Sequence, residues 1–122
     1  MKRPLIALAL STTLATPAWA KDVNGEHAAL GPGGTTCARY LEARDTGNAD
    51  LEYDYRIWIS GYLSAFNVTV GHTYNILGPR GMDEAVALID KQCRQTPNAL
   101  FVSAVARTTV MLYPDRYNLK PD

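Results

Sequence analysis

The longest periodic stretch of the chain is residues 51–66, which read LEYDYRIWISGYLSAF. Large apolar side chains recur there every three or four residues, the spacing that stacks side chains on one face of an α-helix. The series is Leu51, Tyr55, Trp58, Tyr62 and Phe66, with Ile59, Leu63 and Ala65 widening it. We predict a central amphipathic helix whose aromatic side chains dominate the core.

Capping and helix-terminating residues mark both ends of this helix. Asn48 and Asp50 are each able to cap its first turn. Toward its other end, the β-branched residues 68–70 precede Gly71 and favour fraying or a turn. Gly61 lies inside the helix, where glycine costs about 1 kcal/mol relative to alanine. Its presence predicts close approach by the backbone of another helix, and a kink is the competing explanation.

Three further helices are expected around the central one. The first is capped by Thr35 or Thr36 and is broken by residues 45–48. Its shared face consists of Cys37, Tyr40 and Leu41. The third follows a glycine-rich loop at residues 71–81, and its apolar stripe consists of Met82, Val86, Ile89 and Cys93.

Pro97 ends the third helix, and Asn98 is placed to cap the fourth, which stops at Tyr113-Pro114. Its apolar positions are Phe101, Val105, Thr108 or Thr109, and Leu112. No stretch alternates apolar and polar residues over a length that would build a sheet. We therefore predict an all-α, small four-helix domain that spans residues 35–114.

The N-terminal segment has the features of an export signal. Lys2 and Arg3 precede an apolar run, and Ala18-Trp19-Ala20 supplies small residues before a cleavage site. The run is too short to span about 30 Å of hydrocarbon. We predict a bacterial signal peptide over residues 1–20, cleavage after Ala20, a periplasmic protein, and no membrane insertion after cleavage.

Two segments outside the helices are expected to lack regular structure. Residues 21–34 are rich in Gly, Asn and Pro and predict a flexible N-terminal arm. Their glycine run lacks the Gly-Lys-Ser/Thr ending that binds phosphate. Residues 115–122 form a polar tail.

The two cysteines, Cys37 and Cys93, predict a single disulfide in an oxidising compartment. Closing a loop of about 57 residues stabilises the fold by about 4 kcal/mol in the chain-entropy model. A redox or nucleophilic thiol is the alternative, but the chain has no Cys-x-x-Cys pair. Two Cys and two scattered His also have no recognisable metal-ligand spacing, so we expect no metal and no cofactor.

The 122 residues include 12 Lys and Arg and 12 Asp and Glu, for a formal net charge of zero. This balance lacks the basic excess of a nucleic-acid binder. Removal of Lys2 and Arg3 with the signal leaves two more acidic than basic residues. In strong acid the carboxylates are neutral, and the basic residues with His27 and His72 leave a charge of about +12.

A small hydrolase is the least favoured function. Ser60, Ser64, His72 and Asp54 are its nearest nucleophile and base candidates, but the serines are not in a nucleophile elbow. Glu52 and Asp54, two residues apart on a helix, point in different directions and make a poor pair for glycoside hydrolysis. We expect that the protein is not an enzyme.

The sequence resembles the HdeA/HdeB family of small periplasmic acid-stress chaperones. The matching residues are 36–41 (TCARYL) and 88–93 (LIDKQC), followed by Pro97 and Phe101, and Trp58 lies where this family often has an aromatic residue. The resemblance implies an all-α domain with a Cys37–Cys93 disulfide that is a homodimer near neutral pH. Acid would loosen the dimer and expose apolar surface that holds unfolding client proteins.

A second resemblance is to the Rap/Tai type of periplasmic immunity proteins, which neutralise toxins delivered by type VI secretion. It is carried by residues 61–65 (GYLSA), Pro97 and residues 104–114. Both resemblances imply a non-catalytic protein that acts through protein contacts, with unfolded clients in one case and a dedicated partner in the other. The expected partner or client surface consists of Trp58, Tyr62, Phe66, Met82, Val86 and Ile89.

Overall fold

The computed structural model describes residue 24 and residues 26–122. The predicted signal peptide and its cleavage site after Ala20 lie outside the described residues. Four α-helices and two short 3-10 helices follow one another, and the described part of the chain contains no strand. They are η1 (Gly31–Gly34), α1 (Cys37–Thr46), α2 (Ala49–Thr69), α3 (Met82–Gln95), α4 (Phe101–Leu112) and η2 (Tyr113–Asp115). The predicted all-α four-helix class is confirmed.

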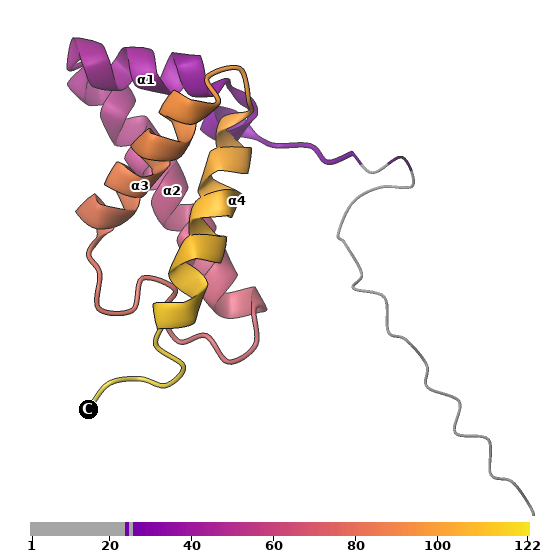
Figure 1. The fold of residues 1–122 in the computed structure, drawn as a ribbon, viewed down its shortest axis with the longest axis vertical. Helices are drawn as coiled ribbons and strands as arrows, with labels where there is room; N and C mark the ends of the chain where they lie inside the picture. Colours follow the sequence, from indigo (N-terminus) through magenta and orange to yellow (C-terminus); the bar gives the residue numbers. More distant parts are fainter. Residues whose placement is uncertain (1–23, 25) are drawn as a thin grey trace, which may run out of the picture.

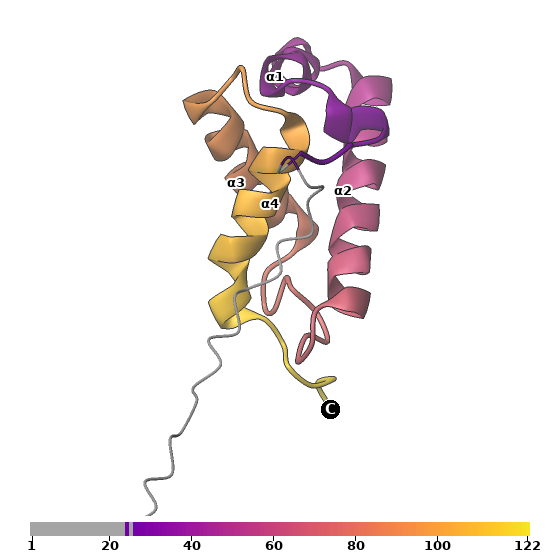
Figure 2. The same cartoon turned by 90° about the vertical axis from the view of Figure 1, so that its right-hand side faces the viewer.

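The helices form two layers with a cover at one end. In Figure 1, α3 and α4 lie side by side in front of α2, and α1 lies across one end of all three. Figure 2 shows α2 alone on one side of the molecule, facing the layer of α3 and α4. The C-terminus lies at the end opposite α1, beside the loop that joins α2 to α3.

Local capping explains where the first two helices start and stop. The Thr36 side chain accepts a hydrogen bond from the backbone N–H of Arg39, and α1 ends at Gly47, whose φ of 65° is left-handed. Asn48 then caps α2 by accepting from the N–H of Leu51 at 3.2 Å. Both starts agree with the sequence prediction.

The start of α4 differs from the prediction, because Leu100 and not Asn98 occupies the cap position and no side chain caps the helix. The segments before α1 and α4 instead pair through an antiparallel bridge between Thr36 and Leu100. The N–H of Phe101 donates to the carbonyl of Thr35 at 2.8 Å, and the N–H of Cys37 donates to that of Ala99 at 2.8 Å. The two helix N-termini therefore satisfy each other's exposed donors.

The disulfide prediction is confirmed: Cys37 and Cys93 are bonded, with their Cα atoms 4.9 Å apart, and they join α1 to α3. Both cysteines are fully buried in one continuous core. The largest fully buried side chains of this core are Tyr40, Phe101, Ile59, Ile76, Ile89, Leu112 and Val105.

The predicted aromatic stripe of α2 is only partly central. Tyr55, Ile59 and Leu63 are the buried row of the helix, whereas the side chains predicted to dominate the core, among them Trp58, are mostly half-buried at its edge. From Trp58 onward, the predicted stripe is therefore one residue away from the buried row, Ile59 and Leu63. Ala65, expected to widen it, is exposed.

Gly61 is not explained by contacts within the fold. A Cβ atom at this position would meet nothing within 4 Å, so the predicted close approach of another helix is wrong for the described residues. The helix continues through Gly61 and ends at Thr69, among the β-branched residues 68–70 where fraying or a turn is predicted.

The close approach occurs at Gly33 instead, within the segment expected to be a flexible arm. Gly31–Gly34 form η1, and Gly33 is buried beneath the Trp58 ring, where a Cβ would lie 2.1 Å from the Cζ2 atom. The Trp58 indole N–H also donates to the carbonyl of Leu30 at 2.9 Å. Apolar contact and one hydrogen bond thus hold residues 30–34 against α2, despite their composition.

The loop from residue 70 to 81 closes the end opposite α1. Ile76 is fully buried there, and its N–H donates to the Asn67 side chain at 2.7 Å. Asn75 pairs with Tyr117 in an antiparallel bridge, so the first residues of the predicted polar tail are bound to this loop. In the described part of the chain, no helix has the length and apolar character needed to span a membrane.

Replacing Cys37 by Ser (Cys37→Ser) is expected to lower the free energy of unfolding by about 4 kcal/mol, because the unfolded chain regains the entropy of an open loop. Urea unfolding of wild type and variant measures the change. Reductant should bring wild type to the variant's stability and leave the variant unchanged. An unaltered unfolding midpoint in the variant would contradict a structural role for the bond.

The glycines near and within α2 provide a matched pair of substitutions. Gly33→Ala is expected to cost about 1–3 kcal/mol, since the new methyl group displaces the Trp58 ring. Gly61→Ala should be neutral or stabilise by up to about 1 kcal/mol, because the site is open and alanine favours helix. Thermal unfolding of both variants measures the contrast, and equal effects would show that η1 does not pack as described.

Candidate functional site

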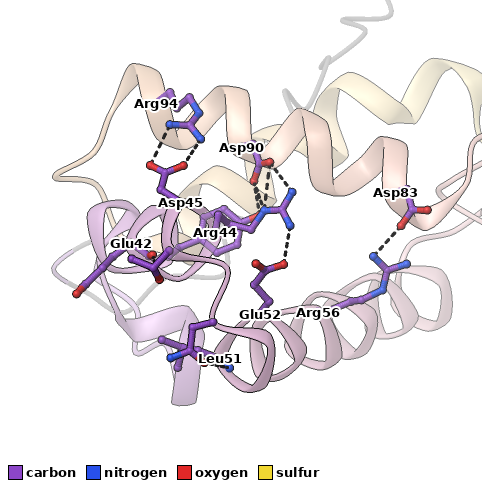
Figure 3. Close-up of polar contacts among 12 residues, drawn as sticks. Glu42, Arg44, Asp45, Leu51, Glu52, Arg56, Asp83, Asp90 and Arg94 are labelled. Carbon is purple, nitrogen blue, oxygen red and sulfur yellow. Dashed lines mark hydrogen bonds and ion pairs between the residues drawn. The ribbon is translucent and has the colours of Figure 1, made fainter.

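The most connected polar group of the described residues is centred on Arg44. Its Nη1 atom donates to the Glu52 carboxylate of α2 at 2.9 Å, and its Nη2 atom donates to the Asp90 carboxylate of α3 at 3.0 Å. Figure 3 shows Arg44 extending from α1 between these two acids. One guanidinium, about a third exposed, therefore joins three helices. We call Tyr40, Arg44, Glu52 and Asp90 the Arg44 cluster.

Tyr40 forms the buried side of this cluster. Its hydroxyl donates a hydrogen bond to the Asp90 carboxylate, while its ring packs between Tyr55 and Phe101, with centroids 5.0 and 4.6 Å away. Burial raises the pKa of Tyr40 far above its usual value, and the bond to Asp90 raises it further. The phenol stays protonated and donates, so the aromatic core is coupled directly to an ion pair. The same carboxylate raises the pKa of Arg44.

Further ion pairs join the elements around this cluster (Figure 3). Arg94 of α3 binds Asp45 of α1 at 2.7 Å, and Arg56 of α2 binds Asp83 of α3 at 2.8 Å. A third pair, Arg80 with Asp115 at 2.8 Å, ties the residues before α3 to η2. In each pair the acid is more than half exposed, and each pair is individually weak at neutral pH.

The hydrogen bond from Arg94 holds the pKa of Asp45 below its usual value. A carboxyl with a depressed folded-state pKa stabilises the fold at any pH above its unfolded-state pKa, near 4. This stabilisation is lost as the pH falls from about 4 through the lower, folded-state pKa. This ion pair between α1 and α3 is therefore lost only below about pH 4.

The residues predicted as a partner or client surface do not form one face of the folded protein. Val86 and Ile89 belong to the buried core, and Met82 is half-buried at the start of α3. The remaining three, Trp58, Tyr62 and Phe66, are half-buried along α2.

Trp58, Tyr62 and Phe66 have different neighbours. Trp58 and Tyr62 have ring centroids 5.5 Å apart, and Trp58 also contacts Phe101. Phe66, two turns further, packs edge-on against Tyr113 with centroids 6.4 Å apart. Burial raises the pKa of Tyr62. The row therefore covers the core edge from η1 to η2.

The candidate catalytic residues lie in separate surroundings. Ser60 and Ser64 are exposed on α2, and the Ser64 hydroxyl donates to the Ser60 carbonyl at 2.8 Å. The carbonyl of His72, in the following loop, accepts from the Arg116 guanidinium. Glu52 contacts Arg44, whereas Asp54 lines a different surface, so the two acids point apart as expected.

Two surface hollows lie on either side of the first half of α2. One, of about 310 Å³, lies beside the Arg44 cluster and is lined by Tyr40, Arg44, Gly47, Ala49, Glu52, Tyr53, Arg56, Ile59 and Val86. The other, of about 410 Å³, is lined by Pro32, Tyr53, Asp54, Ile57 and Trp58. Among the described residues, no group of three or more Cys, His, Asp or Glu is arranged to hold a metal ion.

The sequence analysis missed the Arg44 cluster, although the disulfide contained a signal for it. Tyr40 follows Cys37 by one helical turn, and Asp90 precedes Cys93 by one turn. A bond between the cysteines brings these neighbouring positions together, and Arg44 lies one turn beyond Tyr40.

Comparison with known proteins found no matching family model, no similar curated protein and no similar solved structure.

Replacing Asp90 by Asn (Asp90→Asn) is expected to lower the free energy of unfolding at pH 7 by about 2 kcal/mol, because charged hydrogen bonds to Arg44 are lost. Glu42→Gln is the control, since Glu42 pairs with Arg39 within α1 and joins no other helix. Urea unfolding at pH 7 measures both. A loss in the control as large as in Asp90→Asn would assign the effect to net charge alone.

Proposed function

We propose that this chain is a non-catalytic periplasmic protein that binds other proteins, an acid-stress chaperone similar to the HdeA/HdeB family. Near neutral pH the helices are closed over the apolar core. In strong acid they separate, and the exposed core faces hold unfolding client proteins and prevent their aggregation. The resemblance of the two cysteine regions and the ionic links between helices support this proposal.

The observation that carries the proposal is the dependence of interhelical contacts on carboxylates. Glu52 and Asp90 bind Arg44, and Asp45 and Asp83 bind arginines on a neighbouring helix. Protonation of these acids removes the attraction and leaves the arginines charged. Repulsion among the remaining cations then favours an open state.

The disulfide determines which helix is released. Cys37–Cys93 keeps α1 bound to α3 at any pH at which the bond is intact. Helix α2, in contrast, has no disulfide; it follows α1 after residues 47–48 and contacts the other helices through its buried row and through the Arg44–Glu52 and Arg56–Asp83 pairs. Movement of α2 would expose its buried row, Tyr55, Ile59 and Leu63, together with Val86 and Ile89 of α3.

The test is suppression of aggregation of a mixed periplasmic extract at pH 2–3 and at pH 7, with binding of an apolar dye followed in parallel. Protection and dye binding are expected only in acid, because the core faces are closed at neutral pH. Protection at neither pH would contradict the chaperone proposal and favour a dedicated partner, as in the immunity proteins.

A double variant separates the role of the Arg44 cluster from general protein charge. Glu52→Gln with Asp90→Asn mimics the protonated cluster and should shift the onset of dye binding and protection to higher pH. Glu42→Gln with Glu84→Gln is the matched control, since these acids pair with arginines three or four residues away in the chain. Equal shifts in both variants would contradict a specific role for the cluster.

A further inference from the structure

The outer side of α2 carries an apolar groove that remains open in the folded protein. It is the hollow lined by Pro32, Tyr53, Asp54, Ile57 and Trp58, which we call the α2 groove. Tyr53 is 63% exposed and Ile57 is 54% exposed. Figure 2 shows η1, which carries Pro32, lying against the same half of α2. The groove thus has one wall from each element.

The walls of this groove are held in place by the fold. The indole N–H of Trp58 donates to Leu30, and its ring covers Gly33 and contacts Tyr62 and Phe101. A groove with preset walls loses little conformational entropy when a ligand binds. Its apolar surface is therefore available near neutral pH without any opening of the helices.

Charge at the groove is of one sign. Asp50, Tyr53, Asp54 and Ile57 follow the spacing that places side chains on one helix face. Within the described part of the chain, neither Asp50 nor Asp54 forms an ion pair. Arg56, the basic residue of α2, is bound to Asp83 of α3. Asp54 thus lines the groove, and the helix spacing places Asp50 one turn before it, on the same face as the exposed Tyr53.

We infer that the α2 groove docks a segment of a partner protein that carries a lysine or arginine and, about one helical turn away, an apolar side chain. The cation lies between Asp50 and Asp54 over the Tyr53 ring, an arrangement that combines ion pairing with cation–π attraction. The apolar side chain lies on Ile57 and Trp58. Apolar anchors spaced by one turn are a recurrent mode of helix recognition.

The same charges disfavour other occupants. A second copy of this chain in a symmetric contact would place the same patch on both sides, with Asp50 and Asp54 of one copy near those of the other. Nucleic acids and anionic membranes are repelled by the acids. A basic, amphipathic protein segment matches both the apolar and the charged parts of the groove.

The test measures binding of a synthetic amphipathic helix of leucine and lysine to the full chain at pH 7. Trp19→Phe leaves Trp58, in the groove wall, as the fluorescent tryptophan. A saturable change in its emission is expected with this peptide and none with the same peptide carrying glutamate in place of lysine. Equal binding of both peptides, or of neither, would overturn the inference.

Variants locate the binding. Asp50→Asn with Asp54→Asn, and separately Ile57→Ser, should each weaken binding at least tenfold while circular dichroism stays unchanged. Glu42→Gln with Glu84→Gln removes the same charge away from the groove and should leave affinity unaltered. An equal loss in this control would mean diffuse charge attraction and overturn the inference.

Sedimentation at pH 7 tests the second-copy alternative. Self-association that Ile57→Ser abolishes would assign the groove to a second copy and overturn the inference, and a size unaffected by this variant would support it. The inference goes beyond acid opening, because it concerns the folded protein. Failure of peptide binding at pH 7 would overturn the groove inference and leave the chaperone proposal standing. Failure of protection at pH 2–3 would overturn the chaperone proposal and leave the groove inference standing.

Discussion

The bonded contact between α1 and α3 is the constraint on which the remaining structure depends. Cys37 and Cys93 fix the register of the two helices, and this register brings Tyr40 to Asp90 one turn away. Because Asp90 is then positioned beside α1, Arg44 can bind it and still reach Glu52 on α2. A covalent bond in the core thus determines which charged side chains meet at the surface.

Much of the fold follows from local sequence signals. The Thr36 and Asn48 caps, the cysteine pair and the apolar spacing predict four helices and one disulfide, and the structure contains them. The cap of α4 could not be predicted, because its donors are satisfied by the backbone before α1. Contacts between segments about 65 residues apart leave no local pattern in the sequence.

The prediction of which face of α2 points into the core is less accurate, because a segment distant in the sequence packs against this helix. Periodicity identifies an apolar side of a helix, but Trp58 and Ile59 are adjacent, and their stripes differ by one position. Which of them is central depends on what packs against the edge. Here η1 packs against Trp58, although its glycine-rich sequence has no helical pattern. Trp58 therefore lies at the edge of the core and Ile59 at its centre. The Arg44 cluster is harder to predict from the sequence, since ion pairs between helices can be identified only once the register of the helices is known.

Helix α2 therefore has two distinct apolar surfaces, of which one is covered and one is exposed in the folded protein. Its inner row, Tyr55, Ile59 and Leu63, is buried in the core. Its outer residues, Tyr53 and Ile57, remain exposed in the closed state. The inner row has no acid among its members and suits any unfolded apolar segment, whereas the outer face combines a limited apolar area with two carboxylates. In the proposed docking, the outer face consequently discriminates between partners by charge, whereas in the proposed acid-opened state the inner row discriminates only by apolar area.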